Sequence, residues 1–204
     1  MLHYAAVDTP TLELLKQLME EPAFSGLRLV GGTALALRIG HRRSIDIDLF
    51  GSLDIDVYSL SQKLNNLGKV TILNQTENIH VYLINEIKVD IVNYHYPWLE
   101  EGILIDGIRL AATKDIAAMK LAAITGRGTK KDFIDLFYLL KKFTLKEMLS
   151  FYENKYTDGS AFLVMKSLTY FEDADREQSP VMLQQLDWEK VKKTITSVVH
   201  HLLK

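Results

Sequence analysis

Residues 31 to 50 read GGTALALRIGHRRSIDIDLF, and this stretch decides the fold. Its glycine pair, Gly31-Gly32, follows a short, mostly apolar run at residues 27–30 and precedes an alanine- and leucine-rich segment at residues 33–38. This order predicts a buried strand, a tight turn and a helix. The last six residues, 45–50, alternate strictly between apolar and polar side chains as far as Leu49, which predicts a second strand.

The second strand carries two aspartates, Asp46 and Asp48, which project from one face about 6.5 to 7 Å apart at the backbone. Carboxylates at this spacing can share metal ions, and Mg²⁺ prefers carboxylate and phosphate oxygens. A D-x-D pair alone is weak evidence, because such pairs are common at strand ends and helix caps. Asp54 and Asp56 have the same spacing but precede a predicted helix, where an N-cap is the better interpretation.

The residues around the first acidic pair favour phosphate chemistry. Gly31-Gly32 would let backbone amides approach a phosphate, and the following helix would direct its unpaired N–H groups at the same anion. Arg42 and Arg43 precede the acidic strand, where a guanidinium can bind triphosphate oxygens. Ser44 lies two residues before Asp46 on the same face. Each feature alone is explained by a structural turn or a solvated basic loop, but their combination within twenty residues favours a nucleotide site.

A third carboxylate is expected on a neighbouring strand, because the metal that activates the attacking oxygen needs another ligand. Asp90 is the acidic member of an alternating run at residues 87–92, which we predict to form a β-hairpin with residues 79–84. An exposed position paired with a cross-strand partner explains Asp90 equally well.

The chain changes from strand patterns to helix patterns after residue 110. We therefore predict an α+β protein with a mixed sheet domain at residues 1–111 and a helical domain at residues 112–204. Thr113 and Asp132 are expected to cap the first two helices of the helical domain. The other expected elements are helices at residues 10–21, 56–67, 144–156, 160–170 and 187–203, and strands at residues 70–73 and 103–110.

Composition sets limits on the function. The formal net charge of −2 provides no global basic field, so any contact with RNA would be local. The absence of cysteine excludes disulfide frameworks, thiolate zinc sites and cysteine nucleophiles, and it fits a reducing compartment. The N-terminal residues lack a signal-peptide pattern, and no apolar run reaches the roughly 18 residues that cross a bilayer. We expect a cytoplasmic protein with no membrane partner.

Two blocks of the sequence resemble the AbiEii/AbiGii toxin family of nucleotidyltransferases. The first block is residues 31–50, and the second combines residues 115–121 with Arg127 and residues 131–136. Both occur in order across more than half of the chain. The resemblance implies the polymerase-β-like nucleotidyltransferase fold, a mixed sheet with flanking helices, followed by a helical domain that closes over the nucleotide.

The resemblance also implies roles for individual residues. The metal ligands would be Asp46, Asp48 and Asp90, the last as third acidic ligand or base. The triphosphate would be contacted by Gly31, Gly32, Thr33, Arg42 and Ser44. From the helical domain, Lys120 would reach the nucleotide phosphates, with Asp132 and Asp135 orienting it or the acceptor.

Sequence reasoning independent of the family gives partial support for the helical-domain residues. Lys120 is the only charge within residues 116–124, an otherwise apolar stretch. Without the family, a lysine whose ammonium reaches solvent from a packed helix is the favoured explanation. Asp132 alone resembles an N-cap, whereas Asp135, one turn later on the same face, has no capping role.

The function implied is transfer of a nucleotide from an NTP, with Mg²⁺ or Mn²⁺, to an acceptor. The expected acceptor is RNA such as the tRNA 3′ end, in a toxin–antitoxin or phage-defence system with a cognate antitoxin protein. A nucleotidyltransferase-type antitoxin or regulator that modifies a partner protein would use the same chemistry, as would transfer to a small molecule. A non-catalytic nucleotide-binding member is disfavoured because all three acidic positions are present. A metal nuclease or D-x-D glycosyltransferase requires neither Gly31-Gly32 nor Lys120.

Overall fold

The computed structural model describes residues 1–203, which form two compact units. The sheet unit comprises residues 1–40, 44–95 and 102–111. The helical unit contains the chain from Ala112 onward together with two short segments, His41–Arg43 and Tyr96–Glu101, whose neighbours in sequence belong to the sheet unit. Within the residues described, no helix is long and apolar enough to span a membrane.

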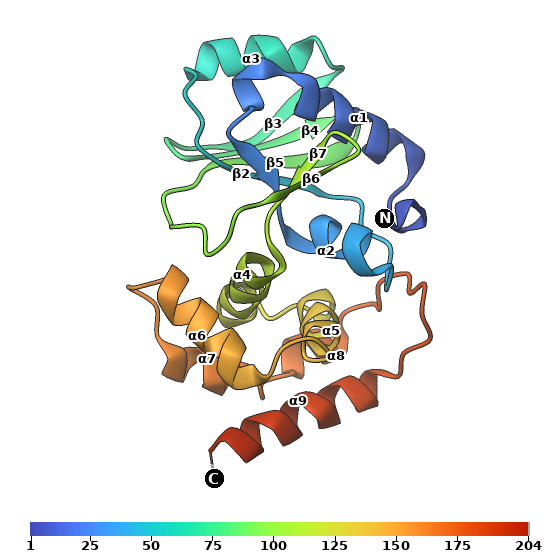
Figure 1. Ribbon diagram of the computed structural model, residues 1–204. Helices are drawn as coiled ribbons and strands as arrows, with labels where there is room; N and C mark the ends of the chain where they lie inside the picture. The colour runs from blue at the N-terminus through green and yellow to red at the C-terminus, as the bar shows by residue number, and fades with distance from the viewer. Residues whose placement is uncertain (204) are drawn as a thin grey trace. The chain divides into compact units, whose positions relative to one another are not determined.

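The sheet unit is built on a seven-stranded mixed sheet with the order β3-β4-β5-β2-β1-β7-β6 (Figure 1). The strands are β1 Leu27–Leu29, β2 Ile47–Gly51, β3 Val70–Gln75, β4 Ile79–Ile84, β5 Ile87–Asn93, β6 Ile103–Ile105 and β7 Ile108–Leu110. The predicted strand at residues 103–110 is two strands, because Asp106 and Gly107 adopt positive φ angles of 50° and 81° and form a tight hairpin turn.

The predicted hairpin before Asp90 is confirmed. Strands β4 and β5 are antiparallel, and Asn85 and Glu86 between them adopt positive φ angles of 49° and 66°. Two consecutive left-handed residues give the turn whose twist matches that of a two-residue hairpin. The turn fixes the register and places Val81 opposite Asp90.

The centre of the sheet brings the predicted acidic strands together. Strand β2 lies between β1, to which it is antiparallel, and β5, to which it is parallel. Alternation along β2 and β5 buries four apolar side chains, Ile47, Leu49, Val89 and Ile91. The parallel register pairs Asp48 directly with Asp90, so both aspartates project from the opposite face.

Three helices accompany the sheet. They are α1 Thr9–Glu20, α2 Gly31–Ile39 and α3 Val57–Asn65, with 3-10 turns at Tyr4–Ala6 and Pro22–Phe24. Helices α1 and α3 lie on the same side of the sheet (Figure 1). The carboxylate of Asp56 accepts hydrogen bonds from the backbone N–H groups of Tyr58 and Ser59, which confirms that this second D-x-D aspartate is an N-cap.

The helical unit contains α4 Thr113–Gly126, α5 Lys130–Leu139, α6 Leu145–Lys155, α7 Ala161–Ser167, α8 Glu172–Arg176 and α9 Trp188–Leu202. Helix α4 packs against α5, α6 and α7, and α5 packs against α9. The capping roles predicted for Thr113 and Asp132 are wrong. Ala112 and Thr129 occupy the N-cap positions, and Asp132 lies inside the first turn of α5, where its carboxylate binds cations instead.

A fully buried ion pair holds the segment Tyr96–Glu101 within the helical unit. Lys155 Nζ lies 2.7 Å from Asp115 Oδ1 and donates to the backbone carbonyl of Pro97 at 2.8 Å, while the same carboxylate oxygen accepts from the backbone N–H of Leu99 at 2.9 Å. Because both charges are removed from water, these bonds offset the free-energy cost of burying them.

Candidate active site

The acidic face of the sheet unit consists of Asp46, Asp48 and Asp90, all partly exposed. Asp48 lies in β2 and Asp90 in β5 at directly paired positions, whereas Asp46 precedes β2 by one residue. The structure therefore brings Asp48 and Asp90 together as neighbours on one face. Asp46 lies two residues before Asp48, which is the spacing of side chains on one strand face. The prediction placed Asp46 inside the strand, but β2 begins at Ile47.

Gly31 makes room for the carboxylate of Asp48. Gly31 opens α2 with a φ of +67°, and a Cβ at this position would lie 2.1 Å from Asp48 Oδ2. Any other residue would therefore clash with the carboxylate and adopt an unfavourable backbone conformation. In the structure Gly31 lets an acidic side chain lie against the first turn of a helix, and its predicted close approach to a phosphate stays a prediction.

Thr33 and Ser44 bind each other in the interior of the sheet unit. Their hydroxyl oxygens lie 2.9 Å apart, and the Thr33 hydroxyl also donates to the backbone carbonyl of Asp46. The backbone N–H of Ser44 donates to the carbonyl of Ala6 at 2.9 Å. These bonds fix the segment that leads into β2. The predicted contact of both hydroxyls with a triphosphate stays a prediction.

Lys88 forms an ion pair with the carboxylate of Asp90. Its Nζ lies 2.6 Å from Oδ1 and 2.7 Å from Oδ2, and the two side chains are 40% and 22% exposed. The i, i+2 spacing on one strand face was visible in the sequence, but the ion pair was not predicted. Asp90 is thus a position that already holds a cation.

The acidic face suits a hard divalent cation. Within residues 1–203, no three His, Asp or Glu side chains are arranged to hold a metal ion as they lie. The donor chemistry nevertheless fits, because carboxylate oxygens are the ligands that Mg²⁺ and Mn²⁺ take and Asp48 and Asp90 are adjacent. The ammonium of Lys88 shows that a cation is accommodated beside Asp90.

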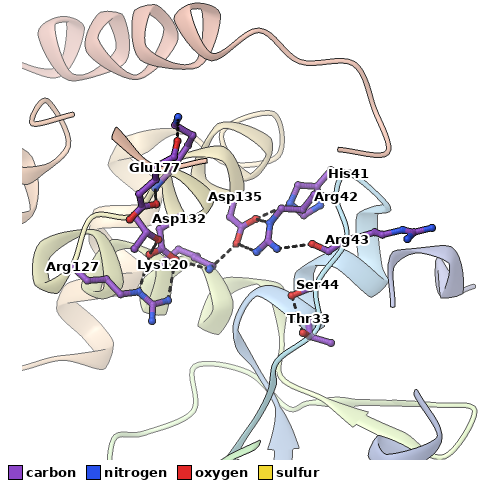
Figure 2. Close-up of polar contacts among 12 residues, drawn as sticks. Thr33, His41, Arg42, Arg43, Ser44, Lys120, Arg127, Asp132, Asp135 and Glu177 are labelled. Carbon is purple, nitrogen blue, oxygen red and sulfur yellow. Dashed lines mark hydrogen bonds and ion pairs between the residues drawn. The ribbon is translucent and has the colours of Figure 1, made fainter. Parts of the chain in front are cut away.

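A second cluster, the buried network, lies in the helical unit and is shown in Figure 2. It consists of His41, Arg42, Lys120, Asp132 and Asp135, each of them no more than 3% exposed. Asp135 is its centre. Its Oδ1 accepts from His41 Nε2 and from Arg42 Nε, both at 2.7 Å, and its Oδ2 accepts from Arg42 Nη2 at 2.8 Å and Lys120 Nζ at 2.6 Å.

Asp132 continues the network toward solvent. Its carboxylate lies 2.9 Å from Lys120 Nζ and 2.9 Å from Arg127 Nε, and it accepts from the Thr129 hydroxyl at 2.6 Å. The side chain of Arg127 is 58% exposed. With His41 neutral, Arg42 and Lys120 balance Asp132 and Asp135 inside the network, and Arg127 adds one positive charge at its solvent-exposed edge.

Coulombic attraction keeps the two carboxylates ionised. Burial would raise the pKa of Asp135, but the charges of Lys120 and Arg42, with hydrogen bonds from Arg42 and His41, hold it well below its usual range. Asp132 is similar, because Lys120 and Arg127 outweigh burial and lower its pKa. Burial would lower the pKa of Lys120, but Asp135 and Asp132 raise it.

His41 is held neutral. Burial lowers its pKa, and the hydrogen bond to Asp135 opposes the change without overcoming it. Its Nδ1 is buried without a hydrogen-bond partner, so protonation would leave an N–H group unsatisfied. The tautomer that carries hydrogen on Nε2 is therefore the one that fits, with its ring packed against Tyr138 at a centroid distance of 4.7 Å.

The network changes the interpretation of two predicted residues. Lys120 is not an ammonium that reaches solvent, because it is 3% exposed and bound to two carboxylates. Arg42 was predicted to contact the triphosphate, which stays a prediction, but its Nε and Nη2 are bound to Asp135 and its Nη1 to the Arg43 carbonyl. His41 was not predicted at all, and no local pattern marks a histidine whose partner is 94 residues away.

Comparison with known proteins decides the family. A model of the family described as nucleotidyl transferase AbiEii toxin, type IV TA system, matches residues 13–201. The chain belongs to this family. It is thus a nucleotidyltransferase-family enzyme of the toxin type found in type IV toxin–antitoxin systems, with a nucleotide as substrate, and the predicted resemblance is confirmed.

This AbiEii-family chain also has a relative in sequence and solved structures of similar fold. The uncharacterized protein aq_aa25 of Aquifex aeolicus is 39% identical over 171 residues, which cover 81% of this chain and 83% of that protein. Among solved structures, the nucleotidyltransferase toxin MenT4 of Mycobacterium tuberculosis has a TM-score of 0.61 at 15% identity, covering 92% of this chain and 80% of its own. JHP933 of Helicobacter pylori has a TM-score of 0.58 at 19% identity, covering 96% and 93%. These likenesses confirm the predicted α+β nucleotidyltransferase fold.

Proposed function

We propose that this AbiEii-family enzyme transfers a nucleotide from an NTP to an RNA acceptor, with Mg²⁺ or Mn²⁺ held by Asp46, Asp48 and Asp90. The single observation that supports the proposal most is the register of β2 and β5, which pairs Asp48 with Asp90 on one face. Asp46 lies two residues before Asp48 and supplies the third carboxylate. Carboxylates grouped in this way provide the oxygen ligands that divalent cations require for phosphoryl transfer.

In the proposed reaction, the acceptor hydroxyl oxygen attacks the α-phosphorus in line with the bond to the β-phosphate. The new P–O bond forms as the bond to pyrophosphate breaks, and pyrophosphate leaves with the electron pair. The hydroxyl proton passes to an oxygen of Asp90. A divalent cation held by the carboxylate oxygens of Asp46, Asp48 and Asp90 would supply charge neutralisation at the phosphates.

The start of α2 is assigned to the triphosphate. Gly31 and Gly32 are the first residues of this nine-residue helix, where backbone N–H groups and the positive end of the helix dipole favour an anion. Thr33 and Ser44 support the site by position, because the Thr33 hydroxyl holds the backbone carbonyl of Asp46 and the Ser44 hydroxyl bonds to that of Thr33.

The buried network is assigned a positioning role and an electrostatic one. Lys120, Asp132 and Asp135 have their polar atoms bonded to one another and to Arg42. We therefore expect them to hold Arg127, the exposed cation at the edge of the network, whose positive charge acts on a bound nucleotide, rather than to make new contacts themselves.

A groove beside α9 supports RNA as the acceptor. It has a volume of about 620 Å³ and is lined by Phe171, Lys192, Lys193, Thr196, Ser197, His200 and His201. Cationic and hydroxyl side chains bind backbone phosphates, and an aromatic ring can stack on a base. Lys192 is also paired with Asp175 at 2.9 Å and Glu189 at 2.8 Å, so the groove is only weakly cationic. This agrees with a local contact rather than a broad nucleic-acid surface.

The proposal is tested by incubating the protein with Mg²⁺, each α-labelled NTP in turn, and total tRNA. We expect label to appear in RNA with one preferred NTP, and to be absent with Asp46→Ala and strongly reduced with Lys120→Ala. Circular dichroism must show that each variant is folded. No transfer to any acceptor, or equal transfer by Asp46→Ala, would overturn the enzymatic proposal.

The same reactions performed with candidate partner proteins separate the acceptors. Labelled protein without labelled RNA would replace the RNA acceptor by a protein acceptor and leave the chemistry of the acidic face intact. An antitoxin gene beside the gene for this chain, whose co-expression restores growth, would support the toxin setting.

A further inference from the structure

We propose that Lys88 is a built-in counter-cation of the acidic face, which competes with the divalent metal for Asp90 and thereby sets the metal affinity of the enzyme. The inference rests on the proposed function, because that function makes Asp90 a metal ligand. It adds a residue that neither the family motifs nor the sequence analysis assigned.

The ammonium contacts both oxygens of the carboxylate that the proposed function makes a metal ligand. Lys88 Nζ lies 2.6 Å and 2.7 Å from the two oxygens of Asp90, so it lies between them rather than on one side. Lys88 and Asp90 are two residues apart on β5 and project from the same face as Asp48. A divalent cation bound to Asp48 and Asp90 would lie close to this ammonium, and like charges at that distance repel one another.

The ion pair between Lys88 and Asp90 is weak enough for a metal to displace it. Lys88 and Asp90 are 40% and 22% exposed, and an ion pair open to solvent is weak because water and salt compete for both charges. Lys120 in the buried network is the opposite case, because it is 4% exposed and bound to two fully buried carboxylates. Lys88 can therefore release Asp90 when a metal arrives, whereas Lys120 is held in place.

Competition by Lys88 and simple positioning of Asp90 by Lys88 predict opposite changes in metal affinity when Lys88 is replaced. If Lys88 competes, its removal frees the Asp90 carboxylate and tightens metal binding. If Lys88 instead orders Asp90 for the metal, its removal leaves the carboxylate less well oriented and weakens binding. The sign of the change in metal affinity therefore decides between them without any measurement of activity.

Isothermal titration of Mn²⁺ into the full-length protein is the test, with no nucleotide present. Lys88→Met keeps the aliphatic stem and removes the charge, and we expect it to bind Mn²⁺ about fivefold more tightly than the unmodified protein, which corresponds to about 1 kcal/mol. Lys88→Arg keeps the charge and should bind within about twofold of the unmodified protein. Lys69→Met removes an exposed lysine elsewhere in the sheet unit and controls for the change in net charge.

A double variant locates the effect. In an Asp90→Asn background, Lys88→Met should change the Mn²⁺ affinity no more than Lys69→Met does. Unchanged or weaker binding by Lys88→Met in the otherwise unmodified protein would overturn the inference and leave the metal site standing. Absence of Mn²⁺ binding, or binding unaffected by Asp90→Asn, would overturn the proposed metal site and this inference together.

Discussion

The two charged clusters of this protein use the same residue types in opposite ways. The acidic face has three partly exposed carboxylates and one loose ion pair between Lys88 and Asp90. The buried network has two carboxylates that are fully buried, surrounded by bonded cations, and ionised despite their burial. The proposed metal ligands are thus open to solvent, whereas the carboxylates of the buried network are completely paired.

The difference between the two clusters predicts whether a substitution changes stability or activity. Removing a partner from the buried network leaves an uncompensated charge inside the protein, which costs folding free energy. Removing a carboxylate from the acidic face relieves repulsion between neighbouring like charges and costs little stability, but it should remove catalysis. Stability and activity can therefore be assigned to different clusters and measured separately.

Both tryptophans of the chain, Trp98 and Trp188, belong to the helical unit, which makes the comparison practical. Tryptophan fluorescence during unfolding in urea reports on the buried network's unit. Far-UV circular dichroism reports on both units together.

The largest effect on stability is expected from Asp135→Ala. The substitution leaves Arg42 and Lys120 buried without their shared carboxylate, and we expect a loss of about 3–5 kcal/mol in the free energy of unfolding. Urea unfolding followed by tryptophan fluorescence measures it. Asp90→Asn, which breaks only a solvent-exposed pair, is the matched control and should cost less than about 1 kcal/mol. Equal losses in the two variants would contradict the distinction between the clusters.

Gly31→Ala should have the next largest effect. The left-handed backbone and the clash with the Asp48 carboxylate should cost about 1–3 kcal/mol and displace that carboxylate, so nucleotide transfer should fall as well. Thermal unfolding by circular dichroism and a transfer assay measure the two effects. The control is Gly126→Ala at the end of α4, where a Cβ meets no atom within 4 Å, and it should lose neither stability nor transfer. A Gly31→Ala variant with normal transfer would show that Asp48 does not need its present position.

A smaller cost, about 1–2 kcal/mol, is expected from Thr33→Val. The substitution keeps the shape of the side chain but removes the hydroxyl that binds Ser44 and the Asp46 carbonyl. Thermal unfolding followed by circular dichroism measures the loss, and the affinity for Mn²⁺ should fall because Asp46 is less well held. Full stability together with lost NTP binding would instead assign Thr33 to the triphosphate.

The smallest effect is a pH dependence that comes from His41. The pKa of His41 lies below the usual 6.5 in the folded state. At a pH between the folded-state pKa and 6.5, His41 therefore binds a proton in the unfolded chain but not in the folded one. The helical unit should therefore lose stability as the pH falls from 7 toward 5. Asp135 contributes nothing in this window, because its lowered pKa makes its contribution fall only as the pH drops below about 4. In His41→Gln, the urea midpoint of unfolding should change less between pH 7 and pH 5 than in the unmodified protein. An equal change in the two proteins would count against a neutral buried histidine.

Local patterns predicted much of the fold. Alternation located β2, β4 and β5, and the paired positive φ angles of Asn85 and Glu86 show why two polar residues could be recognised as a hairpin turn. Helix α8 was missed, since five mostly charged residues carry no apolar period. Asp132 was interpreted as a cap because helix starts favour aspartate, but its long-range pairing with Lys120 determined its place.

The site was predicted less completely because its contacts are distant in sequence. Asp48 and Asp90 become neighbours only through the parallel pairing of β2 with β5, which no local pattern specifies. Arg42 and Asp135 are 93 residues apart, and nothing in the sequence shows that one is the other's partner. Sequence identified the chemical groups of the acidic face, and the sheet register showed how two of them are paired.

The most direct test of the account is nucleotide transfer by Asp48→Asn, measured beside its unfolding by circular dichroism and tryptophan fluorescence. We predict that the free energy of unfolding measured by each of the two signals remains within about 1 kcal/mol of that of the unmodified protein. The transfer rate should fall about 10³-fold, which corresponds to roughly 4 kcal/mol of lost transition-state stabilisation. A folded Asp48→Asn protein that transfers nucleotide at the unmodified rate would contradict the assignment of chemistry to the acidic face.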